Sequence, residues 1–200
     1  MKKIVYIFLL FSSLSIISQS KITKNLGDFS ILKVYNGIEL ELINSTEPKL
    51  EITGKKSEIV KIKNVNNTLK ISLPFSLKPE NNLANGEVLV KLYYTNNIDV
   101  IDGNEGATIT GKEIQQDKLE VKSQERAFIN MVVNVKHLEV KAISGGIIKL
   151  SGKAKKQTVD VDLYGIYNGF DLKAKANSSV NAGTGAKAEI LAGETLNAKV

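Results

Sequence analysis

Asp160 and Asp162 are two carboxylates whose spacing in the sequence would suit acid–base catalysis. They flank Val161, so on a β-strand both carboxylates point to one side while the valine points to the other. A pair of outward carboxylates could cleave a polysaccharide, with one group acting as acid and the other as base or nucleophile. Such a site normally adds basic side chains and a long cleft, and Arg126 is the only arginine. A polysaccharide-acting enzyme is therefore the least favoured function.

His137 is the single histidine, and the chain contains no cysteine. A Ser-His-Asp relay would have to use His137, which stands beside Lys136 without a carboxylate at a fixed spacing. Zinc sites and thiol nucleophiles need histidine or cysteine sets that this sequence lacks. We therefore expect His137 to be an exposed turn residue, and we expect neither an enzyme nor a cofactor.

Four residues with oxygen-bearing side chains, Asp99, Asp102, Asn104 and Glu105, cluster in the segment DVIDGNEG. Carboxylate and amide oxygens at this density could bind calcium. Their spacing does not match the EF-hand loop, and Asp, Asn and Gly also form ordinary polar turns. The sequence leaves open whether this cluster binds calcium or forms a turn.

Aromatic residues gather in two places along the chain. Exposed aromatic rings can form platforms for sugars or peptides. The chain has no tryptophan, so the same rings could instead fill the core or pair across strands. The candidate ligand-binding residues are Tyr93, Tyr94, Tyr164, Tyr167, Asp160 and Asp162.

Charge and composition exclude several classes of protein. The formal net charge is +6, from 27 basic and 21 acidic residues. Nucleic-acid binders rely on arginine for bidentate contacts, so we expect these lysines to form a solvated surface and no nucleic acid to bind. Without cysteine the chain can carry neither a disulfide nor an acylated cysteine anchor. Strand pairing and apolar packing must hold the fold together.

Residues 1–20 have the composition of a signal peptide. Two lysines precede an apolar run from Ile4 to Ile17, and a short polar stretch ending at Ser20 suits cleavage. The apolar run is shorter than the roughly 20 residues that a membrane-spanning helix needs. We therefore predict an exported protein, located in the periplasm, at the outer-membrane surface or outside the cell, with no transmembrane span in the mature chain.

Residues 21–95 show the period-two alternation of half-buried β-strands. Turns are expected where paired residues tolerate positive φ, at Asn36-Gly37, Asn66-Asn67 and Asn85-Gly86. The stretch 74–85 lacks alternation and contains two prolines, so we expect a loop there. We interpret 21–95 as an N-terminal segment of antiparallel or irregular strands.

Residues 96–200 repeat with a step of about 20 residues. First-strand valines recur at Val100, Val121, Val140, Val161, Val180 and Val200. A second apolar position follows at Ile109, Ile129, Ile148 and, more weakly, Gly169 and Ala188. One such unit cannot bury its apolar face alone, so the units must stack. The predicted fold is all-β: a parallel β-helix over 96–200, which we expect to be continuous with 21–95 as one domain.

Three stretches resemble the family of putative auto-transporter adhesins, head GIN domain, found in Bacteroidetes-type bacteria. They are FSILKVYNGIELEL, VLVKLYYTNNIDVIDGNEGATI, and the rungs LEVKAISGGIIKL and SSVNAGTGAKAEI with ETLNAKV. Two corners, SQERA at 123–127 and LYGIY at 163–167, depart from the family's small-residue corners. The resemblance implies a right-handed β-helix and an adhesive role, and it carries no catalytic residues.

These observations favour an exported, non-catalytic surface or periplasmic binding module, an adhesin whose partner is a glycan or an envelope or host protein. The alternative is a structural or assembly component of the cell envelope. The chain stops at LNAKV, the first strand of another rung, and the unpaired edge of that strand could self-associate.

Overall fold

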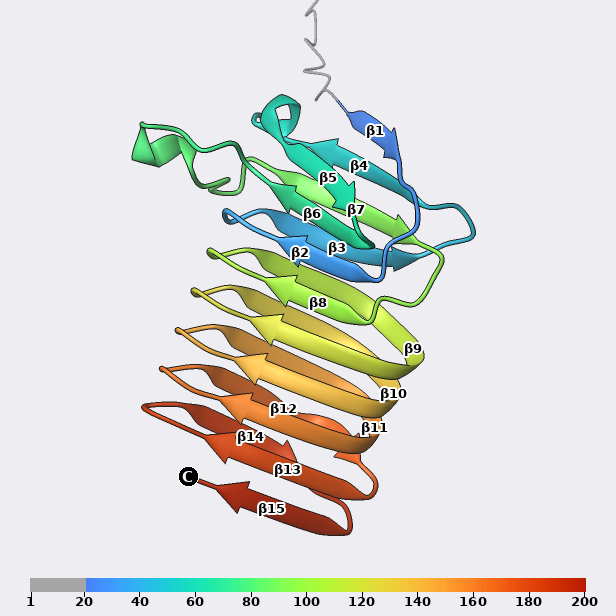
Figure 1. Cartoon of the computed structure of the whole chain (residues 1–200), viewed down its shortest axis with the longest axis vertical. Helices are drawn as coiled ribbons and strands as arrows, with labels where there is room; N and C mark the ends of the chain where they lie inside the picture. The colour runs from blue at the N-terminus through green and yellow to red at the C-terminus, as the bar shows by residue number, and fades with distance from the viewer. Residues whose placement is uncertain (1–20) are drawn as a thin grey trace, which may run out of the picture.

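A computed structural model describes residues 21–200 as a tall stack of β-strands (Figure 1). The predicted signal peptide at residues 1–20 lies outside the described residues. The strands are β1 (Ile22–Asn25), β2 (Ile31–Val34), β3 (Glu39–Asn44), β4 (Lys49–Thr53), β5 (Lys61–Val65), β6 (Thr68–Ser72), β7 (Leu89–Tyr94), β8 (Val100–Gly103), β9 (Thr108–Ser123), β10 (Phe128–Ala142), β11 (Ile147–Val161), β12 (Ile166–Ala174), β13 (Asn177–Ala182), β14 (Lys187–Leu191) and β15 (Thr195–Lys199). The 3-10 helices are η1 (Ser57–Ile59) and η2 (Pro79–Asn81). Within the described range, no helix is long and apolar enough to cross a membrane.

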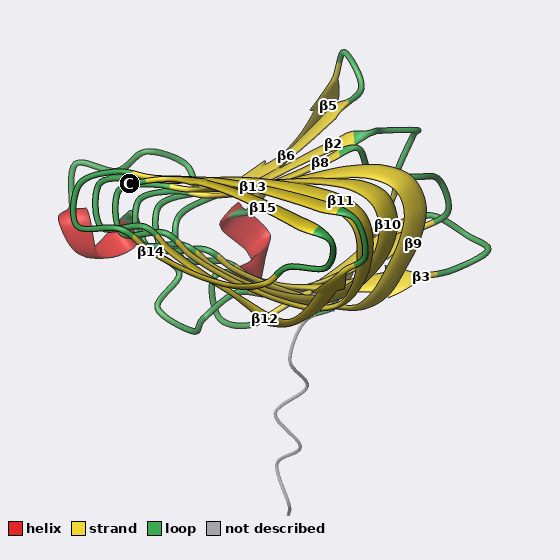
Figure 2. Cartoon of the chain, turned by 90° about the horizontal axis from the view of Figure 1, so that it is seen from below, coloured by secondary structure: helices red, strands yellow, loops and turns green. Residues whose placement is uncertain are grey.

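Seen along its axis, the stack is a flattened coil with two sheet layers (Figure 2). One layer contains β2, β8, β13 and β15, and the other contains β3, β12 and β14. Strands β9, β10 and β11 belong to both layers because they bend from one to the other at what we call the bend edge. Tight turns join the layers at the opposite, corner edge. The predicted all-β solenoid, with rungs about 20 residues apart, is confirmed.

One apolar column runs down the core of the first layer. Its members, taken from the pairing register, are Ile101, Val121, Val140, Val159, Val180 and Ala198. The sequence prediction placed Val100, Val161 and Val200 in this column, and these three positions were wrong. Val161 and Val200 lie two residues from the true members Val159 and Ala198, an error that preserves the alternation and cannot be seen in the sequence. Val100 lies one residue from Ile101, so its side chain points to the opposite side of the strand.

The matching column of the second layer contains Ile109, Ile129, Ile148, Tyr167 and Ala188. The sequence prediction gave Gly169 in place of Tyr167, which is also wrong. The Tyr167 side chain is fully buried, and its hydroxyl donates to Gln157 Oε1 at 3.2 Å. A Cβ at Gly169 would lie 2.4 Å from the Tyr167 ring. The glycine therefore provides the space that the ring occupies.

The N-terminal strands do not join the stack in chain order. Strand β2 lies between β6 and β8, and β3 lies between β7 and β9, all in parallel pairs. The chain therefore forms β2 and β3 first and then forms β4 to β7 on one side of them. It next crosses to the other side of β2, where it forms β8. Strands β1, β4 and β5 pair antiparallel at that end. Segments 21–95 and 96–200 share one sheet, and their folding as a single domain stays a prediction.

The expected turns between the N-terminal strands are confirmed. Positive φ occurs at Asn36, Gly37, Asn66, Asn67, Asn85 and Gly86. Asparagine and glycine are the residues that adopt this conformation at low cost, which explains why these turns could be read from the sequence.

We expect Gly169→Ala to lower the free energy of unfolding by about 1–3 kcal/mol, because the added methyl collides with the buried Tyr167 ring. The double variant Y167I/G169A should recover most of this loss, since Ile148 fills the same column one rung away. Denaturant unfolding of both variants measures the coupling. Equal losses in the single and double variants would contradict the packing argument.

Candidate functional site

The two candidate catalytic carboxylates have structural partners. Asp160 lies in β11, and its Oδ1 accepts a hydrogen bond from Asn181 Nδ2 at 2.9 Å. Asp162 follows β11 at the corner edge. Its Oδ1 accepts the backbone N–H groups of Leu163 and Thr184, each at 2.8 Å. Asp162 therefore connects its own corner to the corner of the next rung by hydrogen bonds, so its carboxylate has a structural role.

We expect Asp162→Ala to destabilise the protein by about 1–3 kcal/mol, because two backbone N–H groups lose their acceptor. Asp162→Asn keeps a carbonyl oxygen at the same place, so its loss should be clearly smaller. Thermal unfolding followed by circular dichroism compares the two. An alanine variant as stable as the unmodified protein would show that the corner does not depend on this acceptor.

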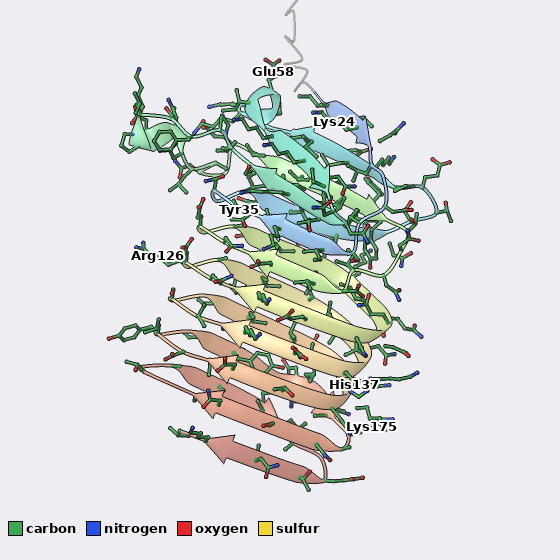
Figure 3. All side chains as sticks on the ribbon, viewed as in Figure 1. Lys24, Tyr35, Glu58, Arg126, His137 and Lys175 are labelled. Atoms are coloured by element: carbon green, nitrogen blue, oxygen red, sulfur yellow. The ribbon has the colours of Figure 1, made fainter. Side chains whose placement is uncertain are left out.

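His137 is exposed, as expected, but it lies within strand β10 at the bend edge, so its predicted position in a turn was wrong (Figure 3). Its register neighbours on the adjacent rungs are Lys118 and Lys156. A shallow hollow of about 630 Å³ adjoins it, lined by Asp99, Val100, Lys118, Leu119, Glu120, His137 and Glu139. The structure therefore surrounds the histidine with charges of both signs.

Glu120, in the same hollow, is held in its ionised form. Partial burial alone would raise the pKa of Glu120, but Lys122 and Lys141 lie 3.0 and 3.2 Å from its carboxylate. Their ammonium groups bring the pKa below the ordinary value of 4.5. A carboxylate with a lowered pKa is poorly suited to donate a proton near neutral pH. Glu120 therefore does not have the raised pKa that the acid of a glycoside hydrolase needs.

The acidic segment around Asp102 forms a tightly bonded corner. Asp102 is buried and lies 3.4 Å from Lys33 Nζ. Its carboxylate also accepts from Asn104 Nδ2 at 2.9 Å and from Gln124 Nε2 at 3.2 Å. In residues 21–200 no group of three or more His, Cys, Asp or Glu side chains could hold a metal ion. The turn interpretation accounts for the Asp102 contacts.

The four candidate tyrosines are dispersed by the fold. Tyr94 and Tyr167 are 5% and 0% exposed, so these two cannot form a surface platform and that prediction was wrong for them. Burial raises the pKa of both hydroxyls. Tyr93 is half-buried and donates to Glu51 Oε2 at 3.2 Å. Only Tyr164 is prominently exposed, at 69%.

Tyr164 belongs to a ladder of turns at the corner edge. Five successive corners have two residues in a row with positive φ: Asn36-Gly37, Glu105-Gly106, Glu125-Arg126, Ser144-Gly145 and Leu163-Tyr164. The N–H of the second residue donates to the carbonyl of the first residue in the next corner, as from Gly145 to Leu163 at 3.0 Å. This ladder aligns the corners along the stack.

Two corners carry large side chains where the others have glycine at the second position. Arg126 and Tyr164 have φ of 62° and 63°, and Leu163 has φ of 47°. Left-handed backbone costs a residue with a Cβ about 1–2 kcal/mol. We call the side chains of Glu125, Arg126, Leu163 and Tyr164 the corner ridge; all four are exposed. Figure 3 shows Arg126 projecting from this edge.

Tyr164 and Arg126 each lie against a glycine of the next rung. The Tyr164 ring covers Gly185, where a Cβ would come within 2.6 Å of it. Arg126 Cγ would lie 3.5 Å from a Cβ on Gly145. Tyr164 was a sequence candidate, whereas Glu125, Arg126 and Leu163 were not. The signal for them was present, because both corners were the departures from the expected small-residue pattern.

The stacked rungs define a β-solenoid protein. The chain belongs to the family described as putative auto-transporter adhesin, head GIN domain, whose sequence profile matches residues 28–200. The family resemblance noted in the sequence is therefore confirmed.

Two solved structures share the fold of this chain but little of its sequence. A putative adhesin from Bacteroides fragilis is 15% identical with a TM-score of 0.70, over 92% of this chain and 98% of that one. A putative lipid binding protein from Parabacteroides distasonis is 14% identical with a TM-score of 0.59, over 91% and 97%. At these identities the likeness is evidence for the fold alone. No curated protein matches the chain.

Proposed function

We propose that the protein is an exported, non-catalytic binding module of the adhesin type, which contacts a glycan or an envelope or host protein through the corner ridge. The observation that carries this proposal is the exposed Tyr164 side chain on a left-handed backbone. Export is supported by the signal-peptide composition of residues 1–20. Adhesion is supported by the family description.

The backbone cost at the ridge argues for a use of its side chains. Glycine stands at the second position of neighbouring corners, at Gly106, Gly145 and Gly185, so glycine satisfies the ladder geometry. Strained backbone concentrates where a side chain has a role beyond stability. Tyrosine and arginine are also the side chains that most often dominate binding energy at interfaces. Arg126 and Tyr164 are therefore the residues we expect a partner to contact.

The carboxylates support a non-catalytic module. Asp162 supports the corner, Asp160 bonds Asn181, and Glu120 is held ionised by two lysines. Asp160 and Asp162, the two carboxylates that the sequence offered for acid–base chemistry, thus have structural partners.

We expect Arg126→Gly and Tyr164→Gly to abolish most binding while leaving the melting temperature unchanged or raised. Glycine relieves the left-handed backbone but removes the contacting side chain. Ser144→Gly is the matched control, because it relieves the same conformation on the same ladder without removing a large side chain. Binding is measured on a glycan array and on immobilised envelope and host-cell surface proteins.

Three outcomes of that screen are informative. Binding lost in the Arg126 and Tyr164 variants but kept in the Ser144 variant supports the ridge. Unchanged binding in the Arg126, Tyr164 and Ser144 variants would show that the partner contacts another part of the protein. An unmodified protein that binds nothing on either surface contradicts the adhesin proposal itself.

A second candidate is assembly in the cell envelope through β15. All five residues of this strand are exposed, and it pairs with β13 alone among the described strands. Leu196 is the register partner of buried Ser178 and so extends a core column by one rung, yet its side chain is 52% exposed. We expect concentration-dependent dimers in sedimentation experiments and a monomer for Leu196→Asp. A strictly monomeric unmodified protein at high concentration would contradict this role.

A further inference from the structure

Five lysines crowd the bend edge near the C-terminal end of the stack. They are Lys153, Lys155, Lys156, Lys173 and Lys175, and we call them the lysine bend. All five side chains are exposed, and none forms an ion pair with another described residue. Figure 3 shows Lys175 projecting from the same edge as His137.

The fold places like charges next to one another at this edge. Lys153 and Lys173 are direct register partners in β11 and β12. Adjacent strands lie about 4.8 Å apart, so these lysines start from neighbouring positions, and like charges opposite one another are destabilising. One rung earlier, Lys136 is neutralised by Asp117 at 2.8 Å. The lysines of the next two rungs have no ion-pair partner among the described residues, so positive charge predominates at the lysine bend.

The lysine bend also borders a hollow of about 350 Å³. Its lining residues are Asn134, Val135, Lys153, Ala154, Lys155, Lys175, Ala176 and Glu194. Glu194 is the one carboxylate among them. Phe170 precedes Lys173 in β12, at a shift of the strand register, and is 65% exposed. The edge thus combines ammonium groups, a concave surface and an aromatic ring.

We propose that the lysine bend binds an acidic polysaccharide. Lysines that repeat along the stack can meet carboxylate or sulfate groups that repeat along an extended sugar chain, and each ammonium acts as a point charge. Phe170 offers an apolar ring to the face of a sugar. This surface lies at the edge opposite the corner ridge, so the proposal does not depend on that ridge.

Nucleic acid is the competing polyanion, and the chemistry of the edge favours the polysaccharide. Bidentate recognition of phosphate and bases uses arginine, and the single arginine, Arg126, projects from the other edge (Figure 3). Single-strand binders also stack successive bases on several aromatic rings, and the lysine bend has Phe170 alone.

The test measures binding of the purified protein to polygalacturonate, with neutral dextran and single-stranded DNA as comparisons. We expect K153Q/K155Q/K175Q to weaken polygalacturonate binding by about tenfold or more, with binding that falls as salt rises. The control K24Q/K61Q/K63Q removes the same formal charge from exposed, unpaired lysines of β1 and β5 and should change affinity little. Phe170→Ala should weaken binding to polygalacturonate but not to inorganic polyphosphate.

Thermal unfolding separates lost binding from lost structure. The triple glutamine variant of the lysine bend should melt at the same or a higher temperature, because it removes like-charge repulsion. If the lysine-bend variant and its control lose equal affinity for polygalacturonate, binding depends on net charge alone and the proposal is overturned. No binding to polygalacturonate at low salt, or tighter lysine-dependent binding to DNA, would overturn it as well.

Discussion

Rung-to-rung hydrogen bonding is the constraint on which this structure depends. Each parallel strand bonds to the strand of the next rung at a fixed spacing of about 4.8 Å, so equivalent residues of successive rungs lie directly over one another. A side chain that suits one rung must therefore suit its neighbours. The columns from Ile109 to Ile148 and from Val121 to Val180 follow from this requirement.

Because of the same constraint, a residue that differs from the others in its column requires a change in its neighbours. Tyr167 occupies a column position that Ile148 fills one rung away, and its larger ring fits because Gly169 beside it has no side chain. The hydroxyl of Tyr167 then needs an acceptor inside the core, which Gln157 supplies; Gln157 in turn donates to Ser178. Buried polar groups are tolerated when they are bonded in this way. Tyr167, Gln157 and Ser178 thus form a bonded polar chain inside the core, and among the described residues no buried side-chain polar atom lacks a partner.

Stacking also determines what the surface can offer. Turns repeat at one edge and bends repeat at the other, so side chains at those edges form rows along the stack (Figures 2 and 3). A row can be neutralised, as where Lys136 meets Asp117, or left uniform, as at Lys153 and Lys173. A solenoid without a deep cleft can thus present two chemically different edges, and extended partners can follow either of them.

The alternation of apolar residues, the turn pairs such as Asn36-Gly37 and the step of about 20 residues were readable in the sequence because they are local. Together with the family resemblance, they determined the all-β solenoid. Local pattern could not distinguish Val159 from Val161 as a column member, because both face the core. It also could not show that β2 is inserted between β6 and β8, since that order depends on pairing between distant strands. The sites follow the same division: exposure of Tyr164, burial of Tyr167 and the convergence of lysines at the bend were decided only when the rungs stacked.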